Sequence, residues 1–243
     1  EIAQCLVGSE MCIRDRVILR QEINRDIKIL VKKIISTAEA GKLIPNNSSV
    51  MIGGFLRCGT PAKLIDELVK NNTSGLTLIA NDTSTPDFDR GKLIVNKQIK
   101  KAIVAHIGTN PETGRQMNAG ELEVELVPMG TLVERIRSGG AGLGGFLTPT
   151  GVGTIVEQGK QIMEIDGRKY LFEKPLRADF ALIYATKIDK FGNAFLEGTT
   201  RNFNPVMATA AETVIVEAEE ISDEPLNPNE VTIPGIFVDY IAS

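Results

Sequence analysis

A glycine-rich segment, residues 53–59, is the first feature of the sequence that could do chemistry. It reads Gly53, Gly54, Phe55, Leu56, Arg57, Cys58 and Gly59, between a short apolar run at 49–52 and a predicted amphipathic helix over 62–70. Such a loop places main-chain N–H groups and a helix N-terminus at the carboxyl end of a parallel strand, where anionic or nucleotide-like ligands bind. The spacing alone is equally compatible with a tight strand-to-helix connection that binds nothing.

Two nucleotide-binding motifs are compared with this loop. The order G-x-G-x-x-G is absent, so a nicotinamide-dependent oxidoreductase is the weaker alternative, and no Gly-Lys-Ser/Thr ends the loop, which excludes a P-loop. Thr60 and Pro61 predict an N-cap and a first-turn proline for the helix. We interpret Cys58 as a small buried residue of the loop and not as a reactive thiol.

A second glycine-rich run, residues 139–153, holds seven of the 23 glycines. Ordering so many glycines costs conformational entropy. We therefore expect this main chain to pass close to another group or to move, and the alternative is a surface loop without a role.

The ionisable residues offer no convincing nucleophile or general base. His106 is the only histidine, and we interpret it as a hydrogen-bonded structural residue at the end of a strand. Glu121, Glu123 and Glu125 alternate along one strand, which is typical of a solvated edge or a partner contact, and Glu197 is a weaker candidate of the same kind. We predict no catalytic residue in this chain and no metal site, since a His/Cys cluster and a serine in a strained elbow are both missing.

The composition excludes several classes of function. Lys and Arg total 27 against 31 Asp and Glu, a net charge of -4, which disfavours nucleic-acid binding. No apolar run reaches the roughly 18 residues of a membrane span. Three cysteines do not make a disulfide framework and fit a reducing compartment, so we predict a cytoplasmic location.

The N-terminal stretch 1–20 is predicted to be non-native, and residues 21–243 to form a single domain. The sequence begins with Glu1, and residues 7–16 resemble a translated sequencing adapter. Apolar residues at helical spacing then predict an amphipathic helix over 23–38 that ends before Gly41.

The rest of the chain alternates between strand and helix patterns. This alternation predicts an α/β fold, an open and mostly parallel sheet with helices on both faces. An inserted hairpin with a turn at Asp166-Gly167 is a further possibility over 155–171. The predicted strands cover 49–52, 76–80, 101–107, 121–127, 181–184 and 213–217, and a third helix covers 131–137 and is closed by Gly139-Gly140.

Five strings of residues occur together and in a fixed order: Gly53-Gly54-Phe55 with Gly59 and Pro61, then 80–83 (Ala-Asn-Asp-Thr), 106–114, 139–154 and 201–205. Together they resemble the A (alpha) subunit of the short-chain acyl-CoA:acid CoA-transferases of the acetate, butyrate and acetoacetate type. The resemblance covers about residue 27 to the end of the chain.

This resemblance implies a partner B subunit of related fold that carries the nucleophilic glutamate. That glutamate would form an acyl-glutamyl anhydride and then a glutamyl-CoA thioester. The segment 53–59 would contact CoA, and 139–153 would lie near the active site and the B subunit. CoA or acyl-CoA would be a substrate, no cofactor would be bound permanently, and the assembly would be a heterotetramer or larger.

Two residues depart from the family pattern. Many relatives carry glycine where Arg57 stands, so this side chain either adds a phosphate contact or points into solvent. Met129 stands where relatives usually have a glutamine whose amide is thought to bind the developing oxyanion, a hydrogen bond that methionine cannot donate. A main-chain N–H therefore substitutes, or the activity differs. The alternative function is a non-catalytic acyl-CoA or metabolite-sensing module on the same scaffold.

Overall fold

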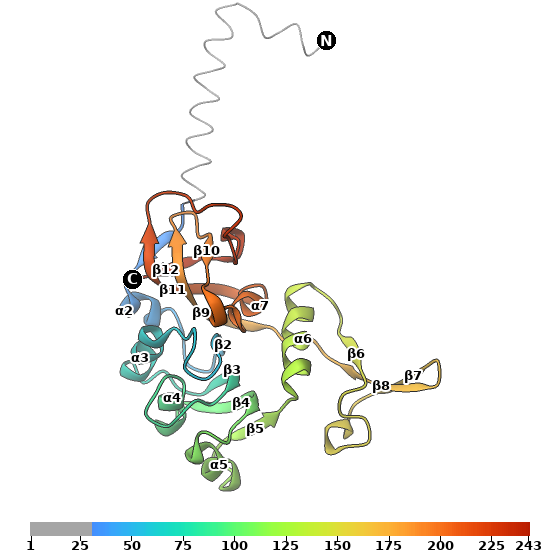
Figure 1. Ribbon diagram of the computed structural model, residues 1–243. Coiled ribbons are helices and arrows are strands. Elements are labelled where there is room, and N and C mark those ends of the chain that lie inside the picture. The colour runs from blue at the N-terminus through green and yellow to red at the C-terminus, as the bar shows by residue number, and fades with distance from the viewer. Residues whose placement is uncertain (1–30) are drawn as a thin grey trace, which may run out of the picture.

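The computed structural model describes residues 31–243, and its first described elements differ from the predicted helix (Figure 1). Residues 33–35 form a strand and not part of a helix: β1 (Lys33–Ile35) is followed by the separate short helix α2 (Thr37–Lys42), which continues through Gly41. The prediction was wrong here because β1 pairs in parallel with β12 (Tyr240–Ala242), a partner about 200 positions away that local periodicity cannot reveal. The stretch 1–20 and the predicted helical residues 23–30 lie outside the described part of the chain.

The main sheet is open and mostly parallel, as predicted. Its hydrogen-bonded order is β1-β12-β11-β9-β2-β3-β4-β5, with the short β10 antiparallel to β9. The strands not yet given bounds are β2 (Ser49–Ile52), β3 (Leu76–Asp82), β4 (Ile99–His106), β5 (Glu123–Leu126), β9 (Ala178–Asp189), β10 (Ala194–Phe195) and β11 (Ala211–Ser222).

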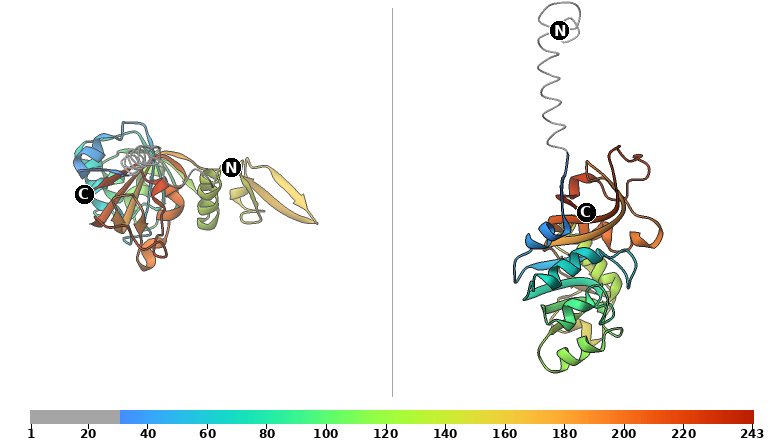
Figure 2. Two further views of the ribbon diagram at one scale, coloured as in Figure 1. Left: turned by 90° about the horizontal axis from the view of Figure 1, so that it is seen from above. Right: turned by 90° about the vertical axis from the view of Figure 1, so that its left-hand side faces the viewer.

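Helices cover both faces of this sheet (Figures 1 and 2). Successive side chains of a strand point to opposite faces, so Ile52 packs in one apolar core with Leu64 and Leu68, whereas Met51 packs in the other core with Leu132. The helices are α3 (Ala62–Lys70), α4 (Gly91–Val95) and α5 (Pro111–Asn118) beside α2, and α6 (Met129–Gly140) and α7 (Asn204–Ala208) on the opposite face; single 3-10 turns are η2 (Ile155–Glu157), η3 (Gly198–Arg201) and η4 (Gly235–Phe237).

A small antiparallel sheet projects from the body beyond α6 (Figure 2). It contains β6 (Phe146–Thr148), β7 (Ile162–Ile165) and β8 (Arg168–Glu173) in the order β6-β8-β7. The hairpin predicted over 155–171 is confirmed, with its turn at Asp166 and Gly167, both at positive φ. The single-domain organisation stays a prediction.

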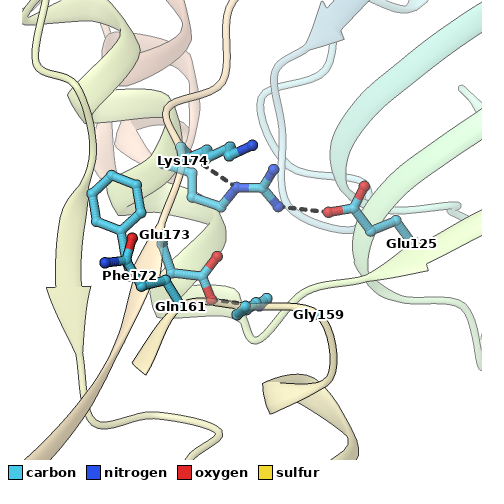
Figure 3. A pocket seen from close by; sticks show the side chains of 8 residues that line it. Glu125, Gly159, Gln161, Phe172, Glu173 and Lys174 are labelled. Carbon is cyan, nitrogen blue, oxygen red and sulfur yellow. Dashed lines mark hydrogen bonds and ion pairs between the residues drawn. The ribbon is translucent and has the colours of Figure 1, made fainter. Parts of the chain in front are cut away.

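An ion-pair network joins this small sheet to the edge of the main sheet, around a cavity of about 470 Å³ (Figure 3). Arg135 of α6 donates to Glu125 of β5 at 2.6 Å and, through Nε, to the carbonyl of Lys174 at 3.0 Å. Burial acts to raise the pKa of the Glu125 carboxyl, but the Arg135 hydrogen bond and charge outweigh it and lower that pKa. The carboxylate therefore stays ionised beside the guanidinium.

The glutamates of 121–125 lie at the edge of the main sheet, since β5 is its last strand. Glu123 pairs with Lys101 at 2.7 Å, and Glu121 pairs with Lys97 at 3.0 Å. Glu121 and Glu123 are exposed, as a charged, solvated edge requires, whereas Glu125 is partly buried against Arg135. The alternative of a partner contact stays a prediction.

The helix predicted over 131–137 is longer than expected, because α6 begins at Met129 and continues through Gly139 and Gly140. A Cβ on Gly139 would lie 1.9 Å from the carbonyl oxygen of Leu176, and one on Gly140 would lie 2.0 Å from Oγ1 of Thr209. The predicted close approach of this main chain to another group is therefore confirmed at Gly139 and Gly140. Their assignment to a loop was wrong, because both residues belong to α6.

The N-terminus of α3 is capped from another strand. The predicted N-cap, Thr60, was wrong: the helix begins after Pro61, and Oγ1 of Thr60 is buried without a partner. Instead, the carboxylate of Glu217 on β11 accepts from the N–H of Leu64 at 2.9 Å and of Lys63 at 3.3 Å. Burial raises the pKa of the Glu217 carboxyl above 4.5, although these N–H groups oppose the shift.

This raised pKa predicts a pH dependence of stability. The folded protein holds the Glu217 proton more tightly than the unfolded chain, so this group's contribution to the free energy of unfolding is lost as pH rises from the ordinary glutamate pKa through the raised one. In Glu217→Gln the contribution is absent. Urea unfolding between about pH 4 and pH 7 should show wild type losing stability relative to Glu217→Gln as pH rises.

The control is Glu212→Gln, an exposed residue of the same strand, whose unfolding curve should run parallel to that of wild type. Parallel curves for Glu217→Gln and wild type would contradict the assignment.

Candidate functional site

The segment 53–59 forms a tight turn at the carboxyl end of β2. The N–H of Gly53 donates to the carbonyl of Leu182 at 3.0 Å, which continues the sheet for one residue. Phe55 and Cys58 then exchange two main-chain hydrogen bonds of 3.0 Å. Leu56 lies at the tip with φ +51°, a left-handed conformation that costs energy for a residue with a branched side chain. The predicted order of strand, glycine loop and helix is confirmed.

The buried amide of Asn204, from α7, contacts both ends of this turn, Gly53 and Gly59. Its Nδ2 donates to the carbonyl of Gly59 at 2.9 Å, and its Oδ1 accepts from the N–H of Tyr184 at 3.1 Å. A Cβ on Gly53 would lie 1.8 Å from that Oδ1 atom. Gly53 is therefore required by close approach of a side chain and not by its own φ.

The carboxylate of Asp82, at the carboxyl end of β3, supports the tip of the turn. It accepts from the N–H of Leu56 at 3.0 Å and of Ser84 at 2.7 Å, and from Nδ2 of Asn81 at 2.8 Å. Burial acts to raise its pKa, but the Arg90 guanidinium at 2.8 Å and these N–H donors lower it below the ordinary value. Asp82 is therefore an anion beneath the turn.

Four main-chain N–H groups at the turn have no acceptor within residues 31–243. They belong to Gly54, Arg57, Gly59 and Thr60. Gly54, Gly59 and Thr60 are buried. Since unpaired buried donors are costly, these groups are available to an acceptor from a ligand.

A groove of about 860 Å³ opens beside the turn and combines apolar and cationic surface. Phe55 and Leu56 are 37% and 43% exposed there, which is unusual for large apolar side chains at the end of a buried strand. The arrangement suits a ligand with both an apolar part and negative charge. The lining residues are Phe55, Leu56, Arg57, Cys58, Gly198, Thr199, Arg201 and Asn202.

Cys58 lies in this groove and is only partly buried, so its interpretation as a buried residue was wrong in degree. Its Sγ is 2.9 Å from Oγ1 of Thr199, and its carbonyl accepts from Nδ2 of Asn202 at 3.1 Å. The last of the five strings that carry the resemblance, 201–205, thus packs directly on the turn. Arg57, in contrast, leans outward over the ring of Phe88, 4.7 Å from its centroid.

The structure does not gather the other sequence candidates at this groove. His106, at the end of β4, is exposed with its ring against Gly108. Glu197 is exposed in the segment before η3. Met129 begins α6 and, with Phe146 of β6 and neighbouring threonines, lines a separate groove of about 480 Å³.

Residues 31–243 contain neither a metal-binding cluster nor a membrane-spanning helix. Within 31–243, no three His, Cys, Asp or Glu side chains gather in a way that could hold a metal ion. Over the same residues, every helix is too short or too polar to pass through a bilayer.

Sequence reasoning missed Arg90, Glu217 and the roles of Asp82 and Asn204. Asp82 carried one usable signal, a carboxylate at the carboxyl end of an apolar strand next to the glycine loop. Arg90 carried none, because a run of charged residues ordinarily indicates a solvated loop.

The fold and the site define a class: an open parallel α/β protein with a ligand-binding turn at the carboxyl end of a central strand. Residues 34–243 match the family model for coenzyme A transferase. The chain therefore belongs to the coenzyme A transferase family, as the resemblance predicted, and is an enzyme chain of that family.

Curated relatives agree with this membership. The acetoacetyl-CoA:acetate/butyrate CoA transferase alpha subunit of Clostridium acetobutylicum is 54% identical over 210 residues, covering 86% of this chain and 96% of the relative. The acetate CoA-transferase subunit alpha of Escherichia coli K12 is 50% identical with the same coverage.

Solved structures share the fold. An acyl-CoA transferase from Escherichia coli O157:H7 superposes with a TM-score of 0.80 at 23% identity, over 88% of this chain and 47% of that longer chain. Glutaconate coenzyme A-transferase from Acidaminococcus fermentans gives a TM-score of 0.75 at 20% identity, over 87% of this chain and 76% of its own.

The contact between Gly53 and Asn204 predicts a position-specific glycine requirement. Gly53→Ala forces a methyl group onto the buried Asn204 amide and should lower the free energy of unfolding by about 1–3 kcal/mol. The matched control is Gly114→Ala in α5, where a Cβ meets nothing within 4 Å. That variant should gain about 0.5–1 kcal/mol. Equal stabilities of the two variants in urea unfolding would contradict the geometry described.

Proposed function

We propose that this chain is the A subunit of a heteromeric CoA-transferase that moves CoA between a short-chain acyl-CoA and a free carboxylic acid such as acetate, butyrate or acetoacetate. The observation that carries the proposal is the similarity to two alpha subunits of this type, at 54% and 50% identity over 96% of their lengths. The proposed partner is a B subunit, in a heterotetramer or a larger assembly. The proposed cytoplasmic location depends on the cysteine content alone.

In the proposed mechanism, this chain binds CoA and the partner supplies the reacting carboxylate. A glutamate oxygen of the B subunit attacks the thioester carbonyl and expels the CoA thiolate, which leaves an acyl-glutamyl anhydride. The thiolate attacks the glutamyl carbonyl, releases the first acid and leaves a glutamyl-CoA thioester. An acceptor carboxylate then takes CoA by the same two steps in reverse.

The proposed CoA-binding residues are Gly53, Gly54, Phe55, Leu56, Arg57, Cys58 and Gly59. Three features support this assignment: free main-chain N–H donors, the exposed apolar side chains of Phe55 and Leu56, and the two arginines, Arg57 and Arg201, among the residues that line the groove. CoA offers matching groups, because it has anionic phosphates and an apolar pantetheine arm. We further propose that residues 139–153 lie near the active site and the B subunit.

Reconstitution with a B subunit tests the proposal. The isolated chain should show no exchange, whereas the co-expressed pair should transfer CoA from acetoacetyl-CoA or butyryl-CoA to acetate. Hydroxylamine or borohydride should trap the intermediate on the partner, as intact-mass measurement of the two chains would show. A pair that binds acyl-CoA without any turnover would contradict the proposal and support the alternative, a non-catalytic acyl-CoA-sensing module.

Met129 gives a second prediction. If the methionine removes one donor to the developing oxyanion, Met129→Gln should restore it; the side chain is 43% exposed at the start of α6, so an amide fits there. Such a donor contributes about 2.7–4 kcal/mol in other enzymes, so kcat of the pair should rise at least about tenfold. Met129→Leu is the control and should leave kcat unchanged. An unchanged kcat in Met129→Gln would contradict a missing donor.

A further inference from the structure

Arg90 is a fully buried arginine in the connection between β3 and α4, and neither the family match nor the relatives assign it a role. Its side chain is 0% exposed. Burying a guanidinium is costly unless its donors are paired. Here Nε donates to the carbonyl of Asp82 at 2.7 Å, one Nη donates to its carboxylate at 2.8 Å, and the other Nη donates to Asp89 at 3.0 Å.

The same guanidinium faces the main chain of the turn. Its Nη atoms lie 3.5 Å from the carbonyl oxygen of Gly53 and 3.4 Å from that of Leu56. These are long hydrogen bonds, so the stronger link runs through Asp82, which accepts from the N–H of Leu56 at 3.0 Å. Asp82 thus accepts from the N–H of Leu56, and Arg90 donates to its C=O, so both main-chain polar groups of Leu56 are bound.

The backbone conformation of Leu56 requires stabilising contacts of this kind. Its φ of +51° is a conformation that leucine adopts only when surrounding contacts impose it. The segment that carries Arg90 also contacts Arg57, the residue after Leu56. Nη2 of Arg57 donates to Oγ1 of Thr85 at 3.1 Å, and the guanidinium of Arg57 stacks on the ring of Phe88. The connection between β3 and α4 therefore contacts the turn twice, through Arg90 at the main chain of Leu56 and through Thr85 and Phe88 at the side chain of Arg57.

We propose that Arg90 is a positioning residue for the CoA-binding turn: through Asp82 it fixes the left-handed conformation of Leu56 and so the shape of the groove and the direction of the free main-chain donors. This inference rests on the proposed function. It assigns Arg90 no contact with substrate.

A substitution series in the reconstituted pair tests this role. Arg90→Lys keeps the buried positive charge, so Asp82 and Asp89 stay paired, but it loses the planar fork that reaches both carboxylates and the turn. It should raise KM for acyl-CoA about tenfold, while KM for the acceptor acid changes less than twofold. Arg90→Leu should raise this KM further if the variant folds. If Arg90→Leu does not fold, Arg90→Lys alone decides the test.

The control is Arg115→Gln, which removes an exposed arginine that also pairs with two carboxylates, Glu112 and Glu121, but on α5. It should leave both KM values unchanged. An unchanged KM for acyl-CoA in Arg90→Lys, or an equal rise for both substrates, would overturn the positioning role. Absence of exchange in the wild-type pair would instead refute the proposed function, so the two failures are distinguishable.

Discussion

The side-chain amide of Asn204 occupies the space where any residue other than glycine at position 53 would place its Cβ, 1.8 Å from Oδ1. This contact fixes the path of the main chain as it leaves β2. Because the glycines of the turn are conformationally free and the side chains of Phe55 and Leu56 are exposed, contacts from other segments must impose its conformation. Asn204 imposes it at the base and Asp82 at the tip.

The open parallel sheet explains why these groups meet. Residues of 53–59, 81–84 and 202–204 are far apart in sequence, but β2 and β3 are adjacent parallel strands whose carboxyl ends lie at one edge. The β9 and β11 strands lie on the other side of β2, and the chain between them returns as η3 and α7 to pack on the turn. The topology thus brings main chain from three distant segments together at one edge of the sheet, where we propose that CoA binds.

Local patterns predicted the elements that depend on local sequence. The strand at 49–52 and the helix at 62–70 have the predicted bounds, because an apolar run and an amphipathic stripe each determine their own burial. The helix over 23–38 failed in its described part, since β1 forms by pairing with β12. Glu217 was missed for a related reason, because the N–H groups that pair with it belong to Lys63 and Leu64, about 150 positions away. Arg90 pairs with Asp82 and Asp89, which are near in sequence, but their spacing gives no sign that the side chain is buried.

Hydrogen–deuterium exchange of the assembled pair, with and without acetyl-CoA, tests most directly that this chain binds CoA with the main chain of its glycine turn. If the turn binds CoA, exchange at the amides of Gly54, Arg57, Gly59 and Thr60 should slow when the thioester is bound, and exchange in α5 should change little. Unchanged exchange at these four amides, while the partner subunit becomes protected, would contradict the account.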